Sequence, residues 1–308
     1  MILRHDPGLA RKPRDELYVE GEEVNPPRFR RHSAECLGLS NEYPSATTLY
    51  SKFLIASGRR DTCLRWRCVV EWHRYASAVI AFVCAMPMEL RPLRRRLRLR
   101  KSGVGHVGRV GDRPVIAVVT GIGTALAGSA TARLLDAVDV EWVVVVGITG
   151  AIDDHTPIGA LVLPEQVVNG ADGVVYRPTP LRVGDAHGTM WTTDELLTDR
   201  AVHADLRSRG VVSLDMETAS IAKVCDQRGV AWSVVRAISD RAGDGSVDEE
   251  IAGLTHADGT ANRAAVARYL VRHRNALPRL ARLARGSNLA AKQAANAAIM
   301  AVSRSINS

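Results

Sequence analysis

Hydrophobic runs alternate with amphipathic segments from about residue 76 to the last residues of the chain. The runs at 76–84 (ASAVIAFVC) and Trp142–Val146 are almost continuously apolar, as is typical of strands covered on both faces. Between them, Glu89–Leu99 places leucines on one face and arginines on the other, which predicts an amphipathic helix. Strands that alternate with helices predict a largely parallel or mixed sheet with helices on its faces.

The same patterns predict the remaining elements. Val104–Val110 and Val115–Thr120 are expected to form a hairpin around Gly111-Asp112. Gly121–Gly123 and Gly147–Gly150 each follow an apolar run, and both are predicted to be turns where the backbone can approach a ligand. Further elements are expected at the following positions: helices from Thr124 to about Ala137, at Asp199–Arg209, Asn262–His273, Leu277–Arg285 and Asn288–Ser303, a strand at Ala160–Leu163, a surface excursion over 169–192, and a strand–helix–strand unit within 211–244.

The N-terminal region has a different character from the rest. Residues 1–75 lack sustained periodicity and contain Asn25-Pro26-Pro27, which interrupts regular structure. We expect either a poorly structured extension or upstream sequence included by a mis-assigned start. The fold class is therefore predicted as α/β, with one domain over 76–285 built on a central mixed sheet flanked by helices, and a helical tail over 286–308.

Charge and cysteine content narrow the function classes. The chain of 308 residues carries a formal charge of +8, and its arginine excess lies in the first 74 residues, in Arg91–Lys101 and in Arg263–Arg285. We interpret these clusters as solvated faces and expect no nucleic-acid partner, although binding through the N-terminal extension is an open alternative. Five scattered cysteines favour a reducing compartment, the cytoplasm, and no apolar run is long enough to span a bilayer.

Cofactor motifs are absent from the sequence. Cys63, Cys68 and His73 could ligate a metal, but their spacing matches no compact zinc pattern, so no metal is expected. The chain has neither a Walker lysine motif nor a GxGxxG turn that opens a dinucleotide fold. We therefore expect no bound cofactor.

Three acidic residues carry the chemical prediction. Glu89, Glu217 and Asp240 each follow an apolar run within a few residues, so neighbouring parallel strands could bring them to one crevice. Mutual repulsion in an apolar pocket would raise the pKa of at least one, producing a general acid beside a general base, as glycosidic cleavage requires. Each acid also has an ordinary explanation, because Glu89, Asp215 or Glu217 could favour a helix N-terminus and Asp240 could belong to a turn.

Several motifs resemble the nucleoside phosphorylase/nucleosidase superfamily. The corner Asp215-Met216-Glu217-Thr218-Ala219 is followed about twenty residues later by Arg236-Ala237-Ile238-Ser239-Asp240. Ala81–Glu89, Thr120–Gly123 and the stretch from Val146 to Val162 extend the likeness in chain order, over about residues 78–242. The branch that the chain resembles most is the 5′-methylthioadenosine/S-adenosylhomocysteine nucleosidases, which implies a nucleoside phosphorylase-like fold and a purine nucleoside as substrate.

The resemblance assigns a role to each matching residue. It implies that Asp240 protonates N7 of the departing purine while Ser239 orients it, and that Glu89 polarises the attacking water. It also implies a set of substrate-binding residues: Glu217 for the ribose hydroxyls, Met216 beneath the ribose, Gly123 in the glycine turn, and the backbone of Leu196 and Leu197 beside the purine. A homodimer is expected, because sites of this family are often completed by a neighbouring subunit.

Departures from the family pattern leave alternatives open. The corner Ala85–Glu89 keeps only its last acid, and Gly147–Ala151 differs from the family's second glycine turn. The segment 277–298 resembles the tail of the hopanoid-associated phosphorylase branch, and Met190-Trp191 could accept a large apolar 5′-group, although core packing explains that pair more simply. The predicted turn after Val146 carries no arginine to bind phosphate, so we favour water as the nucleophile. The alternatives are a purine nucleoside phosphorylase, a hopanoid-branch enzyme and a nucleoside-binding protein without catalysis.

Overall fold

One mixed sheet forms the centre of the chain. The computed structural model describes residues 79–241, 249–260, 262–273 and 275–306, so the expectations for residues 1–75 and for Cys63, Cys68 and His73 lie outside the described part. Within it, an 11-stranded sheet is formed by β1 (Val79–Cys84), β2 (Arg100–Lys101), β3 (His106–Val110), β4 (Arg113–Val119), β5 (Val140–Ala151), β6 (Leu161–Val162), β7 (Gln166–Asn169), β8 (Val175–Tyr176), β9 (Thr189–Thr192), β10 (Val211–Asp215) and β11 (Ala231–Arg241). The helices are α3 (Pro87–Arg96), α4 (Thr124–Ala137), α5 (Arg200–Ser208), α6 (Thr218–Arg228), α7 (Glu249–Ala252), α8 (Arg263–Arg272) and α9 (Leu277–Ile306).

The long strand β5 organises the sheet. Its first half pairs in parallel with β1, and β11 follows it in parallel along almost its whole length. Near its end, β5 also pairs with β10 in the antiparallel direction, through Ser213 with Ala151 and Leu214 with Gly150. The α/β class and the mixed sheet are therefore confirmed. Because β1, β5 and β11 are parallel, their carboxyl ends lie at the same edge.

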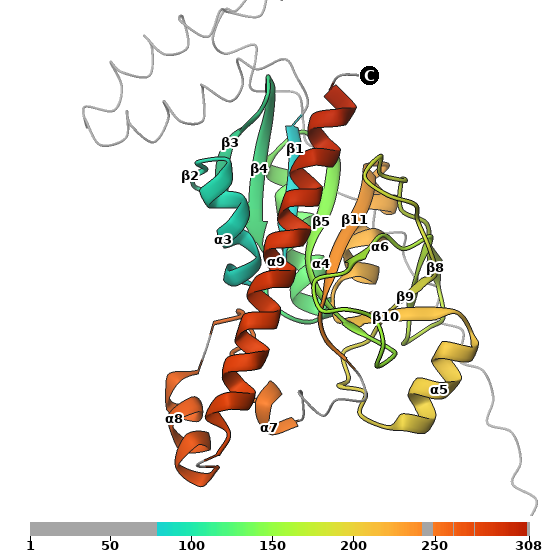
Figure 1. The fold of residues 1–308 in the computed structure, drawn as a ribbon. Coiled ribbons are helices and arrows are strands. Elements are labelled where there is room, and N and C mark those ends of the chain that lie inside the picture. The colour runs from blue at the N-terminus through green and yellow to red at the C-terminus, as the bar shows by residue number, and fades with distance from the viewer. Residues whose placement is uncertain (1–78, 242–248, 261, 274, 307–308) are drawn as a thin grey trace, which may run out of the picture. The chain divides into compact units, whose positions relative to one another are not determined.

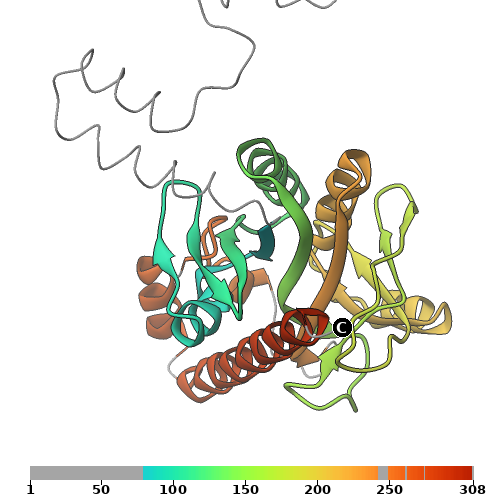
Figure 2. The same cartoon turned by 90° about the horizontal axis from the view of Figure 1, so that it is seen from above.

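Helices cover the two faces of this sheet. One apolar cluster joins the sheet to α4 and α6, and contains Leu134 and Ile221. The other joins it to α3 and α9, and contains Leu93 and a row of small residues such as Ala294 and Ala298. Figures 1 and 2 show α9 crossing β5 and β11 on one face, with α4 and α6 on the other. In the described chain, no helix is both long and apolar enough to cross a membrane.

The predicted turn at Gly147–Gly150 is wrong. These residues continue β5, which extends to Ala151. The absence of a side chain at Gly147 serves packing instead, because a Cβ there would overlap Glu89 Oε1 and lie 2.6 Å from Arg236 Nη1. The glycine therefore makes room for two buried side chains and does not turn the chain.

Two other expectations need correction. The segments at 277–285 and 288–303 form a single helix, α9. A Cβ at Gly286 would lie 2.9 Å from the carbonyl oxygen of Ser239, so this glycine permits close packing between the helix and β11 rather than a break. Most of residues 171–188 are exposed, as expected of a surface excursion, but Thr189–Thr192 form the largely buried strand β9.

Candidate active site

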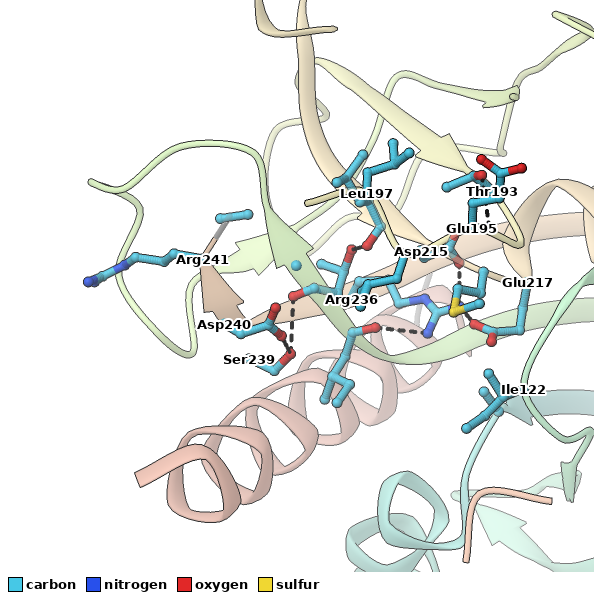
Figure 3. A pocket seen from close by; sticks show the side chains of 18 of the residues that line it. Ile122, Thr193, Glu195, Leu197, Asp215, Glu217, Arg236, Ser239, Asp240 and Arg241 are labelled. Atoms are coloured by element: carbon cyan, nitrogen blue, oxygen red, sulfur yellow. Dashed lines mark hydrogen bonds and ion pairs between the residues drawn. The ribbon is translucent and has the colours of Figure 1, made fainter. Parts of the chain in front are cut away.

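A cavity of about 680 Å³ opens at the carboxyl ends of the central strands. Its wall is built from the corner after β1, the second half of β5, the segment between β9 and α5, and the ends of β10 and β11. Parallel-sheet proteins bind ligands at such strand ends. Figure 3 shows Ser239 and Asp240 on one side of Arg236, and Glu217 with Ile122 on the other.

The structure brings the sequence-predicted residues together. The cavity is lined by Glu89, Leu196, Leu197, Met216, Glu217, Ser239 and Asp240. Gly123 is not part of the lining, but its N–H donates to Glu217 Oε1 at 3.1 Å. Met190 is fully buried in the core cluster, and neither it nor Trp191 lines the cavity, so this pair gives no support for a large apolar 5′-group.

Arg236 is the central residue of the cavity, and its role could not be read from the motif alone. Its side chain is 2% exposed, and its guanidinium lies 2.6 Å from Asp215 Oδ2, 3.3 Å from Glu217 Oε2 and 3.6 Å from Glu89 Oε1. Its Nη1 also donates to the carbonyl of Ile148 at 3.0 Å. The sequence did contain one signal for this role, because Arg236 is the charged residue inside the apolar run 231–238. Buried charges are paired, so this arginine could be expected to have acidic partners.

Glu89 is held by the backbone as well as by charge. The Ile148 N–H donates to Oε1 and the Met86 N–H to Oε2, both at 2.8 Å. Burial raises the pKa of Glu89, while Arg236 and the neighbouring N–H groups oppose this change. A carboxylate has about four acceptor sites, so each oxygen keeps capacity for another hydrogen bond. Glu89 is therefore a fixed base of raised pKa whose oxygens keep unused acceptor sites.

Asp215 and Glu217 divide two tasks at the start of α6. Asp215 Oδ2 accepts from the Thr218 N–H at 3.0 Å, so it caps the helix as it binds Arg236. Glu217 binds Gly123 and Arg236. Burial, reinforced by the negative charges of Asp215 and Glu89, raises the pKa of Glu217 to about 7. Asp215 therefore stabilises the N-terminus of α6, which is the ordinary explanation given above for such an acid. The Glu217 carboxylate instead lines the cavity.

Ser239 and Asp240 form a second polar pair at the end of β11. The Ser239 hydroxyl donates to Asp240 Oδ1 at 2.5 Å. A Cβ at Gly150 would lie 3.2 Å from Asp240 Oδ2, and Gly150 belongs to the cavity lining. Asp240 Oδ2 thus lies beside Gly150, which has no side chain, so a flat ring could approach this oxygen.

The segment between β9 and α5 is fixed at two points. Asp194 Oδ1 accepts from the Thr124 N–H at 2.7 Å, at the start of α4. The buried His203 ring lies with Nε2 2.9 Å from the carbonyl oxygen of Leu197, and a carbonyl can only accept, so Nε2 carries the hydrogen. These contacts hold the backbone of Leu196 and Leu197 against the cavity. Sequence patterns gave no signal for either anchor.

The cavity brings together side chains that can serve as an acid and a base. Among the residues that the structure describes, no group of three or more His, Cys, Asp and Glu side chains is arranged to hold a metal ion. The cavity does place a buried base, Glu89, and a serine-bound acid, Asp240, in one space. Two such carboxyl groups can protonate a leaving group and activate a nucleophile.

Comparison with known proteins identifies a family. A family model described as "Phosphorylase superfamily" matches residues 79–187 and 179–272. The 5′-methylthioadenosine/S-adenosylhomocysteine nucleosidase of Chromohalobacter salexigens is 28% identical over 201 residues, which cover 53% of this chain and 85% of that protein. The nucleosidase of the same name from Geobacillus sp. (strain WCH70) is 27% identical over 199 residues, covering 53% and 86%.

Solved structures share the fold. The futalosine hydrolase of Helicobacter pylori superposes with a TM-score of 0.56 at 18% identity, covering 74% of this chain and 98% of the other. The 5′-methylthioadenosine/S-adenosylhomocysteine nucleosidase of the same organism gives a TM-score of 0.55 at 16% identity, covering 74% and 98%. At such identities the likeness establishes the fold alone, and the two neighbours act on differently named substrates.

Proposed function

The chain belongs to the phosphorylase superfamily, and from this membership we propose that it hydrolyses the N-glycosidic bond of a purine nucleoside. Its sequence relatives are nucleosidases, which supports this reaction type. The observation that carries the proposal is the shared cavity, in which Glu89 is held by two backbone N–H groups while Asp240 is bound by Ser239.

The leaving group is assigned to Asp240. An anionic purine leaves poorly, so a proton delivered to N7 lowers the barrier to breaking the bond between C1′ and N9. The Ser239 hydroxyl fixes one carboxyl oxygen, and the other, beside Gly150, is the one that donates the proton. The backbone of Leu196 and Leu197, anchored by Asp194 and His203, holds the edge of the base.

The nucleophile is assigned to water activated by Glu89. As the C1′–N9 bond breaks, water oxygen bonds to C1′ and its proton passes to Glu89. The raised pKa of Glu89, caused by burial, makes it a better proton acceptor than a solvated carboxylate. Glu217 receives the ribose hydroxyls on its free acceptor sites, with Met216 beneath the sugar, and its negative charge favours the oxocarbenium-like transition state.

Charge balance argues for water rather than phosphate. Phosphorylases need cationic donors for the phosphate, but Arg236 is already shared by three buried carboxylates. Glu89, which must be ionised to act as the base, would repel a phosphate anion placed beside it. A neutral water molecule meets no such opposition.

We assign the substrate to the 5′-modified adenosines, with release of adenine. The named relatives act on 5′-methylthioadenosine and S-adenosylhomocysteine, and Met86 and Ile122 give the cavity an apolar wall.

The two described cysteines, Cys84 and Cys225, are buried and free, which supports a reducing, cytoplasmic location.

Product analysis tests the proposal. The protein is incubated with 5′-methylthioadenosine with and without phosphate, and both the base and the sugar product are identified. Adenine and free 5′-methylthioribose in both incubations are expected. A sugar 1-phosphate formed only in the presence of phosphate would overturn hydrolysis, and absence of base release would favour a binding protein.

The Asp240→Asn variant tests the assigned acid. General acid catalysis contributes about 10²–10⁴-fold, so adenine release should fall by roughly that factor. Asp112→Asn, at an exposed hairpin turn outside the cavity, is the matched control and should keep full activity. Unchanged release by Asp240→Asn would remove the mechanism.

A further inference from the structure

The outward side of α9 carries cations and apolar side chains but no acid. Residues 277–306 contain neither Asp nor Glu. The side that packs on the sheet is a row of small residues such as Ala294 and Ala298, which are fully buried. The opposite side carries residues spaced three or four positions apart, so they lie on one stripe of the helix. This outer stripe consists of Arg285, Leu289, Lys292, Asn296, Met300 and Arg304.

The helix α3 adds more cations beside this stripe. It packs with α9 on the same face of the sheet, and the Arg96 guanidinium donates to Asn296 Oδ1 at 2.7 Å. Arg91, Arg94 and Arg95 are exposed on the same helix, and residues 90–111 contain no acid. Figure 2 shows α9, in red, along the outer edge of the fold with α3 next to it. The two helices therefore form one cationic surface.

The charges of this surface are not neutralised within it. In the part of the chain that the structure describes, no cation of α3 or of the outer stripe forms an ion pair. On the opposite face of the sheet, by contrast, Arg228 of α6 pairs with Asp136 of α4 at 2.8 Å. A concentration of one sign of charge repels itself and attracts a polyanion. The surface of α3 and α9 is therefore suited to an extended anionic partner.

Leu289 and Met300 indicate which polyanion fits. They are 44% and 47% exposed and alternate with the cations of the outer stripe. Proteins that bind single-stranded nucleic acid stack the bases on aromatic side chains, but neither α3 nor α9 contains one. A helix that lies on a membrane combines cations for anionic headgroups with apolar side chains that enter the acyl boundary. The outer stripe has both, which favours a lipid surface.

We propose that the outer stripe of α9, together with the arginines of α3, docks on the surface of a bilayer that contains anionic lipids. The 30 residues of α9, at about 1.5 Å each, offer a contact about 45 Å long. The cations bind headgroup phosphates, while Leu289 and Met300 enter the boundary of the acyl chains. None of the outer-stripe residues lines the cavity, so this surface goes beyond the proposed function and does not depend on it.

The test is cosedimentation of the full chain with phosphatidylcholine vesicles that either contain or lack phosphatidylglycerol. Binding is expected to the anionic vesicles alone, and it should weaken as salt screens the charges. The triple variant Arg94→Gln/Arg285→Gln/Lys292→Gln should bind about 100-fold more weakly, because each cation near an anionic surface contributes separately. Leu289→Gln/Met300→Gln keeps every charge and should bind about tenfold more weakly, because it removes the apolar contact.

The matched control is Arg133→Gln/Arg177→Gln/Lys223→Gln. It removes the same number of charges from exposed positions outside α3 and α9, and two of these positions lie on α4 and α6, which cover the opposite face of the sheet. Its affinity for the anionic vesicles should equal that of the wild type. All variants replace exposed side chains, so their thermal unfolding curves should match that of the wild type.

Three results would overturn the proposal. Equal losses in the two triple variants would show that net charge alone attracts the protein to the vesicles. Undiminished binding by the α3/α9 triple variant, or by Leu289→Gln/Met300→Gln, would assign the contact to other residues, such as the arginine-rich first 74. Binding to a DNA duplex without binding to anionic vesicles would assign the surface to nucleic acid.

Discussion

The Nη2 atom of Arg236 lies 2.6 Å from Asp215 Oδ2, and both side chains are at most 2% exposed. Glu89 and Glu217 also pair with the guanidinium of Arg236, at the longer distances of 3.6 and 3.3 Å. The guanidinium joins residues from β11, the end of β10 and the first turn of α3, which are far apart in sequence. Arg236 therefore determines both the geometry of the cavity and the ionisation of its acids.

Removing the Arg236 guanidinium should lower the free energy of unfolding, and by more at pH 8 than at pH 5. Arg236→Met leaves three buried carboxylates without their cation, and breaking such a pairing costs about 3–5 kcal/mol. We expect that loss in urea unfolding at pH 8 and a smaller loss at pH 5, where the carboxylates can take up protons. Arg228→Met removes an exposed ion pair with Asp136 and should cost about 0–1 kcal/mol at both pH values. Equal losses at the two pH values for Arg236→Met would contradict this account.

Glu217 should make the wild-type protein less stable as pH rises. Its pKa is about 7 in the folded protein against an ordinary value of 4.5, so folding favours the protonated form. The stabilisation from this group is complete below about pH 4.5 and is lost as pH rises through about 7. The free energy of unfolding of Glu217→Gln, relative to wild type, should therefore increase between pH 4.5 and pH 8.

The measurement is a series of urea titrations across this pH range, with Glu165→Gln as control. Glu165 is exposed, so its substitution should give a flat difference from wild type. A flat difference for Glu217→Gln as well would show that its carboxyl is ionised in the folded protein throughout.

A single methyl group at Gly147 should disable the site. The added Cβ would overlap Glu89 Oε1 and approach Arg236 Nη1 to 2.6 Å, so one of these buried side chains must move. Overpacking costs about 1–3 kcal/mol, and misplacement of a reacting group by about 1 Å can cost about 10²-fold in rate. Adenine release by Gly147→Ala, measured beside a thermal unfolding curve, should fall by about that factor. Gly103→Ala adds a Cβ with no atom within 4 Å and should behave as wild type; similar activity in the two variants would contradict the packing argument.

The local pattern of apolar and polar residues was sufficient to predict those helices and strands whose sequence periodicity agrees with their burial. The strand β1, the hairpin of β3 and β4, and the helix α4 were all predictable, because continuous apolar runs and a glycine turn leave few alternatives. The acids at strand ends could be chosen for the same reason, since a parallel sheet directs its carboxyl ends to one crevice.

Glycines were the main source of error. Gly147 was interpreted as part of a turn, and the helix was predicted as two segments on either side of Gly286, whereas each glycine allows close packing inside a continuous element. A local sequence window shows only that a Cβ is missing, and the reason is a tertiary neighbour far away in the chain. Arg236 escaped assignment for the same reason, because its partners come from distant segments.

The close packing of α9 on β11 has a consequence for biosynthesis. The acid-bearing end of β11 leaves the ribosome before the helix that covers it, and Gly286 must reach the Ser239 carbonyl before that end is enclosed. A nascent chain that stops short of α9 leaves the apolar face of β5 and β11 open to water and to chaperones. The order of translation thus keeps the cavity incomplete until the helix has emerged and docked.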